Sequence, residues 1–383
     1  MRWRACALAG VFAVAIAMAA GCSKKDPFDD PYYAAACHGP PLETIEARQA
    51  AMEQGYTISV RFGCIEKKSW EAVQRANELV AGMVAQAERE AQEAAARPPQ
   101  SLAEARQGFH TAIKTPASGT ALPDPPESLF VRADYTGGEG RTLAAFVTPD
   151  PRDGQQHAAL VWITGGDSNS LGDFWKAGTP DNDQSASAFR QAGVVMMFPT
   201  LRGGNIDTGK KEFFFGEVDD VHAAANRLAK LPYVDPARIY LAGHSTGGTL
   251  VLLAAETGGR FAGVFAFGPV SSVDRYPAEF FPGGSIVSDQ EIRLRSPIHW
   301  LNAISTPTYI VEGNQAPSNI GELDELCHHV RNRLVHCVPV FGATHFSVLD
   351  KAARILAPEM TAGTMGEVEM LRSQDFRGEL PAS

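Results

Sequence analysis

Short apolar runs alternate with helical segments from residue 126 onward, and this alternation constrains the fold more than any other feature. Parallel strands need long crossovers, usually helices, and they are apolar throughout because both faces of their sheet are covered. We therefore expect an α/β fold, a mostly parallel sheet with helices on both faces. The predicted strands lie at residues 128–134, 142–148, 158–164, 193–199, 238–242, 261–267, 308–311 and 338–341.

The chain before residue 126 has a different character. Residues 70–96 carry apolar side chains at helical spacing, two prolines follow, and residues 101–113 predict a second short helix. Proline and small residues then suggest a linker up to residue 126. The predicted organisation is a signal peptide over residues 1–21, a helical N-terminal extension and linker over residues 22–125, and the α/β domain over residues 126–383.

The N-terminus reads as an export signal. Arg2 and Arg4 precede an uncharged apolar stretch, and small residues stand directly before Cys22. This arrangement resembles a bacterial lipobox, in which Cys22 becomes the lipidated first residue of the mature chain. We expect a lipoprotein on the bacterial cell envelope, at the outer membrane or the periplasmic face rather than in the cytoplasm. The alternatives are a plain signal peptide or an uncleaved anchor.

Cysteine usage agrees with export. Besides Cys6 and Cys22, the chain contains Cys37, Cys64, Cys327 and Cys337, an even number for an oxidising compartment. Three pairings are open, and we favour Cys37–Cys64 and Cys327–Cys337 because each pair lies within one segment. The second pair also suggests a metal site with the neighbouring histidines, but its spacing fits no zinc pattern. We therefore expect no metal there. Those histidines are His328, His329 and His336.

Composition and charge limit the possible partners. The chain of 383 residues is 44% hydrophobic, which is typical of a globular protein with an ordinary core. Its net charge of −10 means that it has no excess of basic residues of the kind that binds nucleic acid.

One short motif points to chemistry. Residues 243–247 read Gly-His-Ser-Thr-Gly, between a predicted strand and a predicted helix. In a GxSxG turn of this kind the serine oxygen is exposed at the N-terminus of the helix, and the glycines let the backbone approach closely. Ser245 is the candidate nucleophile. The alternative is a glycine-rich packing turn.

Several motifs in order carry a family resemblance. Residues 126–350 resemble the α/β-hydrolase fold, specifically the catalytic domain shared by prolyl oligopeptidases and dienelactone hydrolases. Besides the GxSxG turn, the resemblance rests on residues 189–203, which end in an Arg-Gly turn, on the helix and loop at residues 216–239, and on the loop at residues 341–346. The N-terminal third has no β-propeller repeats, so the likeness is to compact members.

His345 is the candidate general base, because it follows an apolar strand late in the chain, as the order Ser, acid, His requires. The acid has more than one candidate. Where the family has an Asp after the strand at residues 308–311, this chain has Ala316. Glu312, at the end of that strand, is our first candidate and Asp274 the second, because a triad is defined by geometry. Another carboxylate, or none, remains open.

An oxyanion hole needs two N–H donors. We expect one from Thr246, directly after the serine, and the other from Gly166 or Asp167 in the loop after residues 158–164. The family more often has His-Gly-Gly where this chain has Thr164-Gly165-Gly166.

Together these features predict a serine hydrolase that cleaves a small ester or a peptide bond through an acyl-enzyme, with no metal or organic cofactor. The resemblance favours a peptidase, and the missing propeller leaves esters equally open. The alternatives are a catalytically impaired binding lipoprotein on a hydrolase scaffold and an envelope scaffold that acts through its N-terminal helices. Substrate and oligomeric state are not predictable from the sequence.

Overall fold

A computed structural model describes residues 78–86, 89, 101–207, 209–277, 280 and 288–364. The chain divides into two compact units, residues 1–97 and 98–383. In the first unit, residues 78–86 form a helix with exposed apolar side chains such as Leu79 and Met83. The predicted signal peptide, Cys22 and the Cys37–Cys64 pair lie outside the described residues. No helix among the described residues is long and apolar enough to span a membrane.

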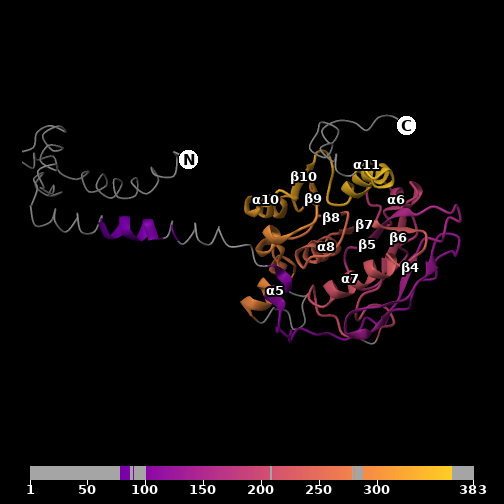
Figure 1. Cartoon of the computed structure of the whole chain (residues 1–383), viewed down its shortest axis with the longest axis horizontal. Coiled ribbons are helices and arrows are strands. Elements are labelled where there is room, and N and C mark those ends of the chain that lie inside the picture. Colours follow the sequence, from indigo (N-terminus) through magenta and orange to yellow (C-terminus); the bar gives the residue numbers. More distant parts are fainter. Residues whose placement is uncertain are drawn as a thin grey trace, which may run out of the picture. The chain divides into compact units, whose positions relative to one another are not determined.

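An eight-stranded sheet organises the second unit (Figure 1). The strand order is β1-β4-β6-β5-β7-β8-β9-β10, and every pair from β6 to β10 is parallel, whereas β4 and β1 run antiparallel at one edge. This is the predicted α/β architecture. The bounds are β1 Val131–Arg132, β4 Ala145–Val147, β5 His157–Ile163, β6 Val195–Pro199, β7 Val234–His244, β8 Gly263–Phe267, β9 Thr308–Gly313 and β10 Val335–Val340, with a separate hairpin of β2 Tyr135–Thr136 and β3 Thr142–Leu143.

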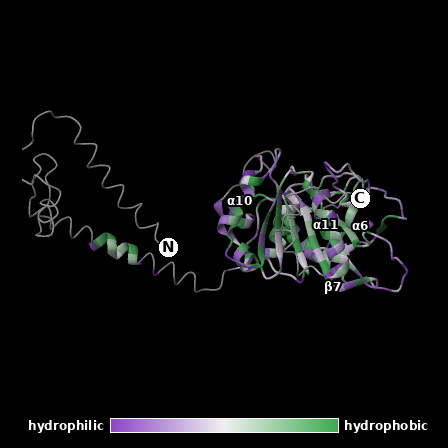
Figure 2. Ribbon diagram, turned by 90° about the horizontal axis from the view of Figure 1, so that it is seen from above, coloured by the Kyte–Doolittle hydropathy of each residue, from purple (hydrophilic) through white to green (hydrophobic). Residues whose placement is uncertain are grey.

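Helices cover both faces of this sheet. Alternate side chains of β5 enter different cores: Val161 packs on the side of α7 and α8, and Leu160 on the side of α6 and α11. Figure 2 shows the hydrophobic residues gathered in the sheet and on the helix sides that meet it. The helices are α5 Leu102–Arg106, α6 Ser187–Gln191, α7 Glu217–Leu228, α8 Thr246–Glu256, α9 Asp289–Arg293, α10 Ile320–His329 and α11 Val348–Ala362, with single 3-10 turns η2 Gly138–Gly140, η3 Val273–Arg275, η6 Pro297–His299 and η7 Leu301–Ala303.

The segment before residue 126 belongs to the second unit from Pro98 onward, so the structure sets the boundary earlier than composition suggests. The Arg106 guanidinium donates to the carbonyl oxygens of Phe214, Phe215 and Leu294, and Thr115 pairs with Lys211 as a β-bridge. The helix predicted over residues 101–113 is shorter in the structure: only α5 forms, because the chain turns at Gly108 with a φ of +74°. Residues 101–125 are thus part of the second unit rather than a linker.

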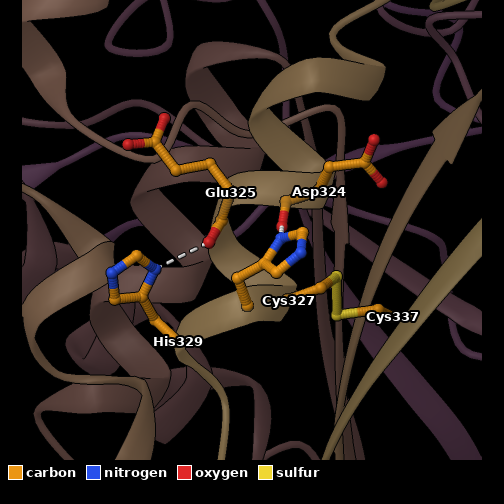
Figure 3. The surroundings of a disulfide bond; sticks show 6 residues. Asp324, Glu325, Cys327, His329 and Cys337 are labelled. Carbon is orange, nitrogen blue, oxygen red and sulfur yellow. Dashed lines mark hydrogen bonds between the residues drawn. A yellow bond between two sulfur atoms is a disulfide. The ribbon is translucent and has the colours of Figure 1, made fainter. Parts of the chain in front are cut away.

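The second predicted disulfide is present. Cys327 near the end of α10 is bonded to Cys337 in β10 (Figure 3). The flanking His329 ring hydrogen-bonds the Glu325 carbonyl oxygen at 2.8 Å, one turn back on its own helix. Within the described residues, no group of three or more His, Cys, Asp or Glu side chains could hold a metal ion.

Removing this disulfide should destabilise the domain. The bond closes a loop with a sequence separation of 10, and loop entropy predicts a loss of about 3 kcal/mol when both Cys327 and Cys337 become alanine. Urea unfolding of the double variant measures the loss. The parent treated with a reductant is the control and should match the variant, whereas a parent midpoint that reductant leaves unchanged would contradict the expectation.

Glu256, at the end of α8, is a buried carboxyl with no hydrogen-bond partner among the described residues. Burial raises its pKa well above the usual value, and the charge of Arg106 opposes this only in part. The folded state therefore keeps a proton that the unfolded chain releases above about pH 4.5. The free energy of unfolding should therefore fall as the pH rises above about 4.5, by up to about 1.4 kcal/mol per pH unit, until the folded protein also releases this proton.

Glu256→Gln tests this assignment, because the amide copies the neutral acid. We expect the variant and parent to be equally stable near pH 4, and the variant to be more stable at pH 7.5. Urea unfolding at both pH values measures the difference. A variant that is less stable than the parent at pH 7.5 would show that Glu256 is ionised in the folded protein.

Candidate active site

Ser245 occupies a strained turn between β7 and α8. Its φ of 54° and ψ of −115° lie outside the regions that non-glycine residues favour. A Cβ on Gly247 would lie 2.7 Å from the Thr164 carbonyl oxygen, so glycine alone permits this approach. The Ser245 N–H donates to the Phe267 carbonyl oxygen at 2.7 Å, which ties the turn to the end of β8. This geometry is that of a nucleophile elbow.

His345 lies in the loop between β10 and α11, and it is 8% exposed. Its backbone N–H donates to the Pro317 carbonyl oxygen at 2.7 Å. Its ring lies against the backbone at Gly268, just after β8, where a Cβ would come within 2.5 Å of Nδ1. Ser245 is hydrogen-bonded to Phe267, which directly precedes Gly268. The elbow and the His345 imidazole therefore border the same short segment at the end of β8.

Glu312 is the carboxylate that contacts His345. Its Oε2 lies 2.9 Å from His345 Nδ1, and its side chain is completely buried at the C-terminal end of β9. The other oxygen, Oε1, accepts from the Gly313 N–H at 2.7 Å. Asp274, the second candidate from sequence, is exposed in η3. The structure therefore brings Glu312, not Asp274, to the histidine.

The loop after β5 packs on the elbow. The Thr246 hydroxyl donates to the Gly166 carbonyl oxygen at 2.9 Å, and a Cβ on Gly165 would lie 3.3 Å from the Ser245 Cβ. Thr246 is the first residue of α8, where a backbone N–H has no acceptor within the helix. Asp167 accepts from the Asn169 N–H and forms an ion pair with Lys211 at 2.7 Å.

A buried ion-pair network holds the turn at residues 212–215, which forms one wall of a cavity next to the Gly166 loop. Arg202 forms ion pairs with Asp220 and Glu212 at 2.8 and 3.0 Å. Glu217 accepts the N–H groups of the turn at residues 212–215. Phe214 in that turn has a φ of 63° and stacks on Tyr276 at 5.5 Å.

This wall borders a cavity of about 360 Å³ beside the Gly166 loop. Its lining combines three phenylalanine rings and Leu250 with polar side chains, which include Asn169, Glu217 and the Asp167–Lys211 ion pair. Sequence reasoning did not find it, because its walls come from loops distant in the chain. The lining includes Gly166, Asp167, Lys211, Phe213, Phe214, Leu250 and Phe280.

Part of this chain is similar to known proteins. Residues 180–313 match the prolyl oligopeptidase family. The uncharacterized peptidase YtmA of Bacillus subtilis (strain 168) is 27% identical over 138 residues, which cover 33% of this chain and 54% of YtmA. The chain thus spans about half the length of this relative.

Two solved structures share the fold. A puromycin hydrolase mutant complexed with PGG aligns with a TM-score of 0.51 and 18% identity, over 64% of this chain and 41% of its own. A puromycin-hydrolyzing peptidase of Mycobacterium tuberculosis aligns with a TM-score of 0.50 and 19% identity, over 63% and 40%. Residues 180–313 are therefore similar to the prolyl oligopeptidase family, and the second unit has the α/β-hydrolase fold.

Proposed function

We propose that this protein is a serine hydrolase that cleaves an ester or a peptide bond through an acyl-enzyme on Ser245. The observation that carries the proposal is the 2.9 Å contact between His345 Nδ1 and the buried carboxylate of Glu312, beside a strained elbow that bears Ser245. A buried carboxylate on Nδ1 sets the histidine tautomer and orients the ring, which leaves Nε2 free to accept the serine proton.

The chemistry follows from this arrangement. The Ser245 oxygen attacks the substrate carbonyl carbon while His345 Nε2 takes its proton, and the imidazolium then protonates the leaving alcohol or amine. The negative oxygen of the tetrahedral intermediate is stabilised by the Thr246 N–H and by an N–H of the Gly166 loop. Water, deprotonated by His345, then attacks the acyl carbon, and the imidazolium returns the proton to the Ser245 oxygen as the bond to the acyl group breaks and the acid leaves. We expect the Ser245 hydroxyl to donate to His345 Nε2 once substrate is bound.

The cavity beside the Gly166 loop supports an apolar acyl group as the part of the substrate that is recognised. Its volume of about 360 Å³ is at the small end of ligand sites. Phe214, on the cavity wall, stacks on Tyr276, which a 2.8 Å hydrogen bond to Thr249 holds in place, so the Phe214 ring is fixed. We infer a preference for a short aliphatic or a single aromatic side chain on the acyl side of the scissile bond.

The N-terminal features extend the proposal to the cell envelope. The lipobox-like residues before Cys22 and the disulfide between Cys327 and Cys337 support export to an oxidising compartment. Mass spectrometry of the mature protein from a bacterial membrane fraction tests this, with a lipid-modified Cys22 at the N-terminus as the expected result. An unmodified Met1 at the N-terminus would contradict it.

Pre-steady-state kinetics test the proposed reaction. The purified chain is mixed with p-nitrophenyl esters whose acyl groups range from acetyl to phenylacetyl, and with the corresponding acyl p-nitroanilides. We expect a burst of one p-nitrophenol per molecule, followed by slower turnover. The relative rates of the two series decide between esterase and peptidase. Absence of turnover on every ester and anilide would contradict the proposal and favour a binding protein on a hydrolase scaffold.

A further inference from the structure

His244, the residue before Ser245, is a second histidine in contact with His345. It is 1% exposed, and its Nε2 lies 2.9 Å from the His345 backbone carbonyl oxygen. The two imidazole rings have centroids 4.5 Å apart. A carbonyl oxygen can only accept a hydrogen bond, so Nε2 carries the proton. In the neutral ring, Nδ1 is then an acceptor.

Gln184 provides the donor for that acceptor. Its side-chain Nε2 lies 3.0 Å from His244 Nδ1 and 2.7 Å from Asn182 Oδ1, and its Oε1 lies 3.1 Å from the same Nδ1. Because Nδ1 carries no proton, the amide bonds it through Nε2, and the second N–H is left for Asn182. The loop around Gln184 is fixed by the buried Asp183 carboxylate, which accepts hydrogen bonds from backbone and hydroxyl groups on both sides. These donors are the Gly178 N–H and the N–H and hydroxyl groups of Ser185 and Ser187.

We infer that His244 is a positioning residue for His345, and that Gln184 selects the His244 tautomer that performs this role. The inference rests on the proposed function and adds a residue pair to it. The His345 backbone is then held on both sides of its Cα: its N–H by the Pro317 carbonyl oxygen and its C=O by His244. With Glu312 holding Nδ1, these contacts fix the direction in which Nε2 points.

The charge of His244 suits this role. Burial, followed by the neighbouring His345 charge, lowers the pKa of His244 to about 3, although the hydrogen bond to the His345 backbone opposes this in part. His244 is therefore neutral at the pH values where His345 takes the serine proton. A positive charge on His244, whose ring centroid lies 4.5 Å from that of His345, would repel the imidazolium that forms on His345 in the transition state.

Two substitutions at one position separate the hydrogen bond from packing. His244→Phe keeps a ring against His345 but removes both hydrogen bonds, whereas His244→Gln keeps an amide donor that can reach the His345 carbonyl oxygen. We expect Phe to lower kcat about 10- to 100-fold with KM within about twofold of the parent, because misplaced catalytic groups slow the chemical step. Gln should restore kcat to within about fivefold of the parent.

The matched control is His222→Phe. His222 is also a largely buried histidine with one side-chain hydrogen bond, at 2.8 Å to Thr257, but it lies on α7 away from His345. Its loss should leave kcat at the parent value. If circular dichroism shows that His244→Phe does not fold, Gln184→Leu tests the positioning role instead. We expect its kcat to be three- to tenfold lower than that of the parent, about the effect of losing one hydrogen bond. Gln191→Leu, on an exposed residue of α6, is its control.

The outcomes are distinguishable. A parent that turns over no ester or anilide contradicts the proposed function itself. A parent that gives a burst, together with a folded His244→Phe variant at the parent kcat, overturns the positioning role and leaves the hydrolase intact. Equal losses in the Phe and Gln variants would also overturn it, because a donor to the His345 carbonyl oxygen would then make no difference.

Discussion

Ser245→Ala should lower kcat on the best ester about 10⁶-fold, the largest effect of any single substitution in this protein. The change removes the only atom that forms the covalent bond, while the oxyanion donors and the cavity stay in place. Alanine tolerates the elbow backbone about as well as serine, so the thermal midpoint should stay close to that of the parent. Steady-state kinetics and circular dichroism measure the two quantities.

Ser272→Ala is the control for loss of a serine hydroxyl, because Ser272 bonds Ser296 in the loop after β8. It should keep the parent kcat. A Ser245→Ala protein that retains more than about 1% of the parent rate would assign the reaction to another nucleophile.

Glu312→Gln should lower kcat about 10⁴-fold. Glutamine has the same shape, so packing at the end of β9 is preserved, but the negative charge is lost. The amide also presents a donor as well as an acceptor to His345 Nδ1, which permits the unproductive tautomer. Because Glu312 contacts no part of the proposed substrate, KM should change little.

Asp274→Asn is the matched control, since Asp274 was the second candidate acid and lies exposed in η3. Parent-like activity of Asp274→Asn is expected. If Glu312→Gln kept the parent kcat and Asp274→Asn had a much lower kcat, Asp274 would be the triad acid. The contact between Glu312 and His345 would then not be needed for catalysis.

The sequence predicts those parts of the site that depend on local patterns. Ser245 stands out because a tight turn between a strand and a helix requires glycines at fixed spacing. His345 stands out because it follows an apolar strand late in the chain. The parallel sheet is predicted because strands buried on both faces must be apolar throughout. The Cys327–Cys337 bond was also predicted, since both cysteines lie in one short segment.

The remaining features depend on tertiary contacts that spacing does not encode. The sequence left the acid open, because Glu312 reaches His345 only when β9 and β10 pair in parallel register. Gln184 gave no sequence signal, since its contact with His244 joins residues 60 apart. Composition also placed the domain boundary too late. The proline-rich segment reads as a linker, yet the Asn205 side chain donates to the Ala121 carbonyl oxygen and holds it on the domain.

Covalent labelling by a fluorophosphonate tests the central claim most directly. Such a reagent phosphonylates an activated serine and leaves ordinary serines untouched. The full chain is treated with one equivalent, digested and mapped by mass spectrometry, beside Ser245→Ala and Glu312→Gln. We predict one adduct, on the peptide that contains Ser245, with slower labelling of the Glu312 variant and none of the Ser245 variant. A folded, disulfide-intact parent that takes up no label, or takes it up at another serine, would contradict the account.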